Sequence, residues 1–155
     1  MATSSYILSV LLFLSLSGVV LSETCAYSIS IKTGSRNDAG TDAKISLKFS
    51  DMEDSAINIS NLEKYGVMEG GHDYSENDQL DLFTYTGPCF TNPVCYIKLS
   101  HDNSGNKPGW YVKYVEITTS SNSAAPIRKH FDVNQWLALD EPPFQISTSR
   151  DMCAT

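Results

Sequence analysis

The most strand-like stretch of this sequence reads Trp-Tyr-Val-Lys-Tyr-Val-Glu-Ile-Thr-Thr, from Trp110 to Thr119. Aromatic and β-branched residues dominate it, and both types are enriched in β-strands. It shows little alternation with polar residues, which is typical of a strand covered on both faces. The stretch therefore predicts a central strand of a β-sheet.

Other strand-like stretches precede and follow this one. Tyr27 to Lys32 and Lys44 to Phe49 alternate apolar and polar residues with the period of two that places the apolar set on one sheet face. Further candidates are Leu80–Tyr85 and Val94–Leu99, with weaker ones at His130–Val133 and Phe144–Ser147. Turn-rich segments separate them, and only Ile59–Tyr65 and Val133–Leu139 suit a short helical turn. The pattern predicts an all-β protein, an antiparallel β-sandwich of about eight strands.

The first 22 residues contain none of the charged side chains of the 155-residue chain. Residues 7–21 form an apolar run, and Val20 and Ser22 suit positions −3 and −1 of a cut before Glu23. The competing interpretation is a membrane anchor, but a spanning helix needs about 20 apolar residues and this run is shorter and broken by serines. We expect a signal peptide over residues 1–22 and a single domain over 23–155.

Four cysteines follow the apolar run, and an even number in a secreted chain predicts two disulfides. Three pairings are possible. Cys89 and Cys95 flank an Asn-Pro turn, which favours a small loop closed by a Cys89–Cys95 bridge. Cys25 and Cys153 would then join the two ends of the domain. An oxidising compartment fits entry into the secretory pathway.

Composition and motifs narrow the function classes. The formal net charge of −7 argues against nucleic-acid binding, which needs clustered lysine and arginine. The three histidines, His72, His101 and His130, are far apart, and neither H-E-x-x-H nor G-x-S-x-G occurs. We therefore expect no enzyme and no small-molecule substrate, but a monomeric, non-catalytic protein.

Three loops are rich in the oxygen ligands that calcium prefers. They cover Asp38–Asp42, Asp51–Asp54 and His101–Asn106, and none has the EF-hand spacing. The competing interpretation is structural, because Asp and Asn are common in turns for conformational reasons. The spacing alone favours the structural interpretation, with calcium as the alternative.

Two aromatic residues and one sequon indicate surface features. Trp136 and Phe144 lie in or beside turn-rich segments, where such side chains either insert at a lipid interface or close the end of a core. Asn58-Ile59-Ser60 is the only valid N-glycosylation sequon, and its use would require a surface position for Asn58.

A series of motifs runs in a specific order along the chain. It comprises Ala-Gly-Thr-Asp-Ala-Lys-Ile-Ser-Leu (39–47), Asn-Leu-Glu-Lys-Tyr-Gly (61–66), Asp-Tyr-Ser-Glu (73–76), Gly-Pro-Cys (87–89), Pro-Val-Cys (93–95), His-Asp-Asn-Ser-Gly (101–105), Gly-Trp-Tyr-Val-Lys-Tyr-Val-Glu (109–116) and Phe-Asp-Val-Asn-Gln-Trp-Leu-Ala (131–138). This series resembles the plant PLAT-domain proteins, small secretory-pathway proteins with a signal peptide and one PLAT (polycystin, lipoxygenase, alpha-toxin) domain. The resemblance covers essentially the whole chain after residue 22 and implies an eight-stranded antiparallel β-sandwich.

The resemblance also implies calcium at loops on one edge of the sandwich. The Gly-Thr-Asp and His-Asp-Asn motifs transfer directly, the loop after the second strand matches more loosely, and the Asp-Tyr-Ser-Glu motif adds one weaker candidate. The implied ligands are Gly40, Thr41, Asp42, Asp51, Asp54, Glu76, Asp102 and Asn103.

The function implied by the resemblance is a non-catalytic binding module that engages a membrane surface or a protein partner, with calcium as a candidate cofactor. The family implies a role in abiotic and biotic stress tolerance and growth regulation, in the endoplasmic reticulum or the apoplast. The alternative is a calcium-independent protein-interaction factor of the secretory pathway that does not bind lipid.

Overall fold

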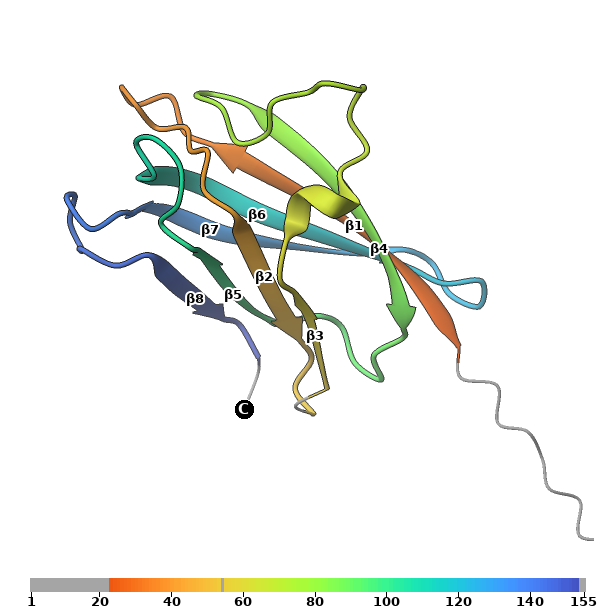
Figure 1. The fold of residues 1–155 in the computed structure, drawn as a ribbon. Coiled ribbons are helices and arrows are strands. Elements are labelled where there is room, and N and C mark those ends of the chain that lie inside the picture. Colours follow the sequence, from red (N-terminus) through yellow and green to blue (C-terminus); the bar gives the residue numbers. More distant parts are fainter. Residues whose placement is uncertain (1–22, 54, 154–155) are drawn as a thin grey trace, which may run out of the picture.

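Two four-stranded antiparallel sheets lie face to face in the computed structural model (Figure 1). The first sheet has the order β4 (Leu80–Pro88), β1 (Thr24–Thr33), β6 (Trp110–Ser120) and β7 (Ile127–Leu137). The second has the order β3 (Ala56–Ile59), β2 (Ile45–Ser50), β5 (Tyr96–His101) and β8 (Ser147–Asp151), and a 3-10 turn, η1 (Leu62–Tyr65), follows β3. The structure describes residues 23–53 and 55–153, so the predicted signal peptide over 1–22 lies outside the described residues.

The alternating strands bury one face between the sheets. Tyr27, Ile29 and Ile31 of β1 are buried, and so are Leu47 and Phe49 of β2. Their neighbours in sequence point outward, as the period of two requires. The predicted all-β antiparallel sandwich is confirmed, and no helix among the described residues has the length and apolar character of a membrane span.

The predicted central strand is β6, which lies between β1 and β7. Its buried side chains include Trp110, Val112 and Val115, which face the other sheet. The prediction that both faces are covered is wrong, because Lys113 is exposed and Glu116 is only half-buried on the outer face. The aromatic and β-branched residues that led to this prediction therefore also occur on the outer face of β6, which is partly exposed to solvent.

Strand β7 replaces the helical turn predicted within Val133–Leu139. A bulge explains the error, because Tyr114 pairs with Asp132 whereas Val112 pairs with Gln135, which leaves one extra residue on β7. The extra residue places the next buried side chain, Leu137, four positions after Val133 and so imitates helical spacing.

Two other boundaries differ from those predicted. The helical turn predicted within Ile59–Tyr65 is present as η1, but it follows a short strand, β3, that the sequence did not indicate. Strand β8 begins at Ser147, the last residue of the segment predicted as a strand, Phe144–Ser147. Phe144 lies in the preceding loop with φ +62°, which is incompatible with a strand.

The disulfide pairing differs from the one predicted. The bonds are Cys25–Cys89 and Cys95–Cys153, not Cys89–Cys95 and Cys25–Cys153. Strand pairing is the reason, because each bridge joins neighbouring strands within one sheet. Cys25 on β1 is opposite Gly87 of β4, and Tyr96 beside Cys95 is opposite Asp151 of β8. The expectation of two disulfides is confirmed.

The eight strands gather their connections at two ends of the sandwich. One end, which we call the acidic end, carries the segments 34–44, 66–79, 102–109 and 138–146, and lies at the left and upper left in Figure 1. Both disulfides lie at the opposite end, which we call the disulfide end.

We predict that non-reducing peptide mapping recovers Cys25 linked to Cys89, and Cys95 linked to Cys153. Because the bridges close loops with sequence separations of 64 and 58, replacing both Cys95 and Cys153 by serine should lower the free energy of unfolding by about 4 kcal/mol or less. Chemical denaturation measures this loss. A recovered Cys89–Cys95 peptide would contradict this pairing.

Candidate functional site

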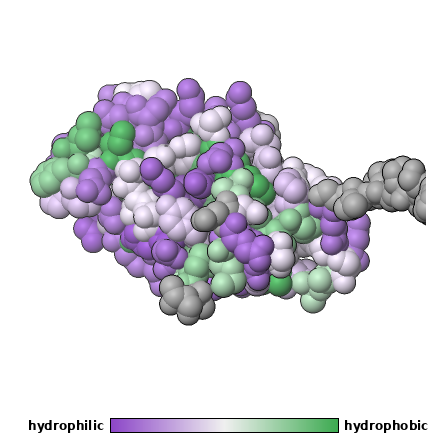
Figure 2. Space-filling view, turned by 90° about the horizontal axis from the view of Figure 1, so that it is seen from below, coloured by the Kyte–Doolittle hydropathy of each residue, from purple (hydrophilic) through white to green (hydrophobic). Residues whose placement is uncertain are grey.

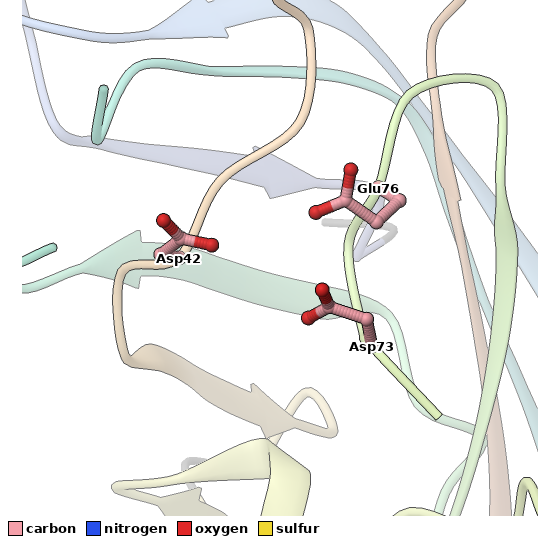
Figure 3. A group of neighbouring side chains, drawn as sticks. All are labelled: Asp42, Asp73 and Glu76. Atoms are coloured by element: carbon pink, nitrogen blue, oxygen red, sulfur yellow. The ribbon is translucent and has the colours of Figure 1, made fainter. Parts of the chain in front are cut away.

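Three carboxylates converge at the acidic end. Asp42 comes from the segment between β1 and β2, and Asp73 and Glu76 come from the segment before β4. Each offers an oxygen within 4.8 Å of the other two, and Figure 3 shows the three side chains turned toward a common space between the two segments. No lysine or arginine of residues 23–53 and 55–153 forms an ion pair with them. We call these residues the carboxylate trio.

A shallow hollow of about 280 Å³ adjoins the trio. Its lining comprises Gly40, Thr41, Asp42, Glu76, Asn77 and Asn106, together with Asp38 and Lys107, which form an ion pair with each other at 2.9 Å. Carboxylate, amide and hydroxyl oxygens are all hard donors of the kind that calcium takes in sets of six to eight. The donor set therefore fits calcium rather than zinc, which favours histidine and cysteine.

Backbone contacts hold the two segments of the trio together. The Thr41 amide donates to the Ser75 carbonyl at 3.1 Å, and the buried Thr41 hydroxyl donates to the Pro108 carbonyl at 2.9 Å. A Cβ on Gly40 would lie 3.0 Å from the Asn77 nitrogen and 3.1 Å from the Ser75 oxygen. The glycine and the threonine of the Gly-Thr-Asp motif thus allow the close approach that positions Asp42.

Hydrogen bonds to a buried carboxylate hold the segment that carries Asp73 and Glu76 in place. Asp81 on β4 is 1% exposed and accepts hydrogen bonds from the Ser75 amide at 2.8 Å and the Gln79 side-chain amide at 2.7 Å. The His72 imidazole also bonds to it, at 2.7 Å, and Gln79 in turn donates to the Asp73 carbonyl at 2.6 Å. A buried carboxylate needs such partners, because an unpaired one is costly.

Asp102 does not join the trio. Its carboxylate accepts hydrogen bonds from the Ser104 hydroxyl and amide and from the Lys44 amide. These donors, led by the Ser104 hydroxyl, lower the pKa of Asp102 to about 2. The carboxylate therefore organises its own turn, and the implied role of Asp102 as a ligand beside Asp42 is not supported by this geometry.

Asn103 lies next to a histidine that fastens the same turn. The Asn103 amide donates to His101 Nδ1 at 3.1 Å, and His101 Nε2 donates to the Leu137 carbonyl at 2.9 Å. Both contacts suit a neutral ring, and burial lowers the pKa of His101 although the Leu137 contact opposes this shift. Asn103 itself has φ +57°, a conformation that asparagine tolerates, and it lines a second hollow rather than the one beside the trio.

Asp51 lies at the disulfide end, far from the trio along the strands. It is buried and accepts hydrogen bonds from the Glu53 amide at 3.0 Å and the Asn92 amide at 3.2 Å. The structure places Asp51 and Asp42 at opposite ends of the sandwich, because β2 runs from one end to the other between them, and the role of Asp51 as a calcium ligand stays a prediction. Asp54 lies outside the described residues.

An apolar rim borders the acidic end. Phe144 and Leu139 are 59% and 58% exposed, and Figure 2 shows hydrophobic surface at the left end of the molecule, where these loops lie. Trp136 is half-buried and meets Tyr111 edge-on with ring centroids 5.4 Å apart. It also lines a hollow of about 460 Å³ with Leu139. Of the two residues predicted to contact a membrane, Phe144 is therefore more exposed than Trp136.

Asp73 is the residue of the trio that sequence reasoning missed. It belongs to the Asp-Tyr-Ser-Glu motif, of which only Glu76 was taken as a candidate ligand. The available signal was its place in the same turn-rich segment, three residues before Glu76. What the sequence alone does not reveal is the approach of this segment to Asp42, which depends on the buried Asp81.

The fold is that of a known domain class. Residues 27–142 match the family model described as the PLAT/LH2 domain, and the chain belongs to this family. It is 43% identical over 130 residues to PLAT domain-containing protein 2 of Arabidopsis thaliana, covering 83% of this chain and 71% of that protein. It is 38% identical over 147 residues to PLAT domain-containing protein 1 of the same plant, covering 92% and 81%. These relatives are named for the domain and not for an enzymatic activity.

Solved structures show the same fold. The coral 8R-lipoxygenase structure, described as showing calcium activation via a C2-like domain, matches with a TM-score of 0.58 at 19% identity. The match covers 81% of this chain and 16% of the lipoxygenase chain. At this identity the likeness concerns the β-sandwich alone.

We predict that Asp81→Asn lowers the free energy of unfolding by about 2 kcal/mol, because it replaces a buried acceptor of several hydrogen bonds with a group that must also donate. Asp73→Asn, a matched change at an exposed position, should leave stability unchanged or raise it. Urea denaturation of both variants measures the difference. Equal effects would contradict the anchoring role of Asp81.

We also predict that Ser104→Ala raises the pKa of Asp102 from about 2 toward 3.8, because it removes the hydroxyl that stabilises the ionised form. Since the folded pKa is the lower one, any stability that Asp102 contributes is present above the unfolded value and is lost as pH falls toward 2. NMR titration of the side-chain carboxyl carbon measures the pKa. Ser149→Ala on β8 is the control and should not move it.

Proposed function

We propose that this chain is a non-catalytic PLAT module that docks onto a membrane surface through its acidic end, with calcium held by the carboxylate trio. The observation that carries the proposal is the convergence of Asp42, Asp73 and Glu76 within 4.8 Å, with no ion-pair partner among the described residues, next to an exposed apolar rim.

Electrostatics favours a cation at this position. Carboxylates so close together repel one another, and the repulsion grows where water is displaced from between them. The trio supplies side-chain oxygens, and the Gly40–Thr41 backbone adjoins the same hollow. When bound, calcium supplies positive charge that offsets the trio and attracts anionic lipid headgroups.

The apolar rim supplies a second membrane contact. Phe144 and Leu139 protrude from the segment between β7 and β8, and aromatic and aliphatic side chains at a lipid interface add binding energy in proportion to the apolar area they bury. The description of the coral 8R-lipoxygenase as calcium-activated via a C2-like domain supports the calcium part of the proposal.

A second candidate function is calcium-independent protein binding without lipid. It is favoured by an apolar strip along the edge strand β4. Tyr65, Val67, Leu80 and Leu82 are 37%, 57%, 43% and 41% exposed, and the Val67 amide bonds to the Leu82 carbonyl. Contiguous exposed apolar residues of this kind mark surfaces that proteins bind.

The proposal extends to the compartment and the biological role. The two disulfides support passage through the secretory pathway, to the endoplasmic reticulum or the apoplast. Asn58 on β3 is exposed, so its sequon is accessible, and a mass shift on treatment with a glycosidase tests whether it carries a glycan. Membership of the PLAT family supports a role in plant stress tolerance and growth regulation.

We predict that calcium titration of the protein by calorimetry gives heat of binding, and that calcium makes the protein sediment with vesicles containing phosphatidylserine. Asp42→Asn with Glu76→Gln should weaken calcium binding by at least about tenfold, because two of three ligand charges are lost. Glu63→Gln with Asp132→Asn, which changes charge and residue types equally at exposed positions elsewhere, should bind calcium as the parent does.

Phe144→Ala tests the membrane contact of the apolar rim separately from calcium binding at the trio. It should retain the heat of calcium binding and reduce sedimentation with vesicles, because only the apolar rim is altered. Absence of heat with the parent protein would refute the calcium part of the proposal. Loss of partner capture on Leu82→Ser, with no vesicle binding by the parent, would favour the second candidate.

A further inference from the structure

Two lysines lie directly opposite each other on the outer face of the second sheet. Lys48 of β2 is the register partner of Lys98 of β5, and both are exposed. Like charges in this position destabilise a sheet. Within residues 23–53 and 55–153 neither forms an ion pair, although acidic residues outnumber basic ones in the chain. Packing does not explain this unfavourable pair.

Neutral hydrogen-bonding groups flank the lysines within their row and on one side, whereas the row on the other side includes Asp151 opposite Tyr96. In the same row, Asn58 of β3 is opposite Lys48 and Ser149 of β8 is opposite Lys98. The next row consists of Ser46, Ser100 and Ser147, of which the first two share a hydrogen bond of 2.7 Å between their hydroxyls. No carboxylate occurs in these two rows. We call the seven residues the lysine face.

The lysine face is hollowed across the width of the sheet. A hollow of about 330 Å³ lies over β3, β2 and β5, and one of about 370 Å³ lies over β5 and β8. Lys98 lines both, so they adjoin. Because neighbouring strands lie about 4.8 Å apart, four strands span roughly 15 Å. The shape is that of a shallow groove across the strands (Figure 1 shows the four strands side by side).

We propose that the lysine face binds an acidic polysaccharide, with the chain lying across the strands. The two ammonium groups pair with sugar carboxylates, and the serine hydroxyls and the Asn58 amide hydrogen-bond to sugar hydroxyls. Tyr96 at the β5 side of the second hollow offers a ring against a sugar face. An extended ligand fits the groove better than a compact headgroup, because the two hollows follow one another across the strands and Lys98 lines both.

Competing anions fit less well. A single-stranded nucleic acid needs several stacking rings and a longer basic track, whereas the face has two cations, with the ring of Tyr96 beside it, in a chain of net charge −7. The face shares no residue with the carboxylate trio, and it lies on the side of the sandwich rather than at the acidic end.

The test measures binding of oligogalacturonate, a sugar-acid chain, to purified protein made in a host that adds no N-glycans, because a glycan on Asn58 would lie on the face. EDTA is present throughout, so that calcium at the acidic end plays no part. We expect binding that weakens as salt rises from 50 to 300 mM, and no binding of neutral dextran. Lys48→Gln with Lys98→Gln should weaken binding at least tenfold.

Lys64→Gln with Lys113→Gln is the matched control, since both lysines are exposed and lie off the face. It should bind as the parent does. The Lys48 and Lys98 double variant should fold with an unchanged or higher urea midpoint, because it loses a like-charge pair. Equal loss of binding in both double variants, or absence of oligogalacturonate binding by the parent, would overturn the proposal. Binding to anionic vesicles but not to oligogalacturonate would also overturn it and assign the face to lipid.

Discussion

Burial of one face of each sheet against the other is the constraint on which the rest of this structure depends. Buried residues such as Ile29 on β1 and Leu47 on β2 alternate with solvated neighbours, so each strand has one apolar side to cover. Two stacked sheets cover all of these sides at once. The connections are then confined to the two ends of the sandwich. Residues far apart in sequence meet there, which is how one end collects carboxylates and the other collects both disulfides.

At the acidic end, the confinement of the connections to one end of the sandwich brings carboxylates together in a geometry that can bind an ion. Asp81 lies inside the molecule, where its hydrogen bonds fix the segment before β4, while Asp73 and Glu76 of that segment stay solvated enough to accept an ion. One buried carboxylate thus positions two accessible ones. The lysine face uses the sandwich differently, because its groups lie on a rigid sheet in register rather than on loops. The loops of the acidic end suit an ion site, and the flat row of strands under the lysine face suits a site for an extended ligand.

Local patterns in the sequence predicted the fold class, since the alternation in Tyr27–Lys32 and Lys44–Phe49 depends only on neighbouring residues. The family motifs predicted Asp42 and Glu76, which do meet. The failures are non-local. The bulge on β7 gave part of a strand the residue spacing of a helical turn. The disulfide pairing depends on β1 lying beside β4 and β5 lying beside β8. The proximity of Asp73 to Asp42, and the distance of Asp51 from both, likewise follow from strand order and not from composition.

The most direct test of the central claim is a crystal structure of the protein grown with calcium. The account predicts one ion with carboxylate oxygens of Asp42, Asp73 and Glu76 at about 2.3–2.6 Å, its remaining positions filled by backbone carbonyls and water. An ion at Asp102 instead, or three carboxylates turned apart into solvent with no ion between them at saturating calcium, would contradict it.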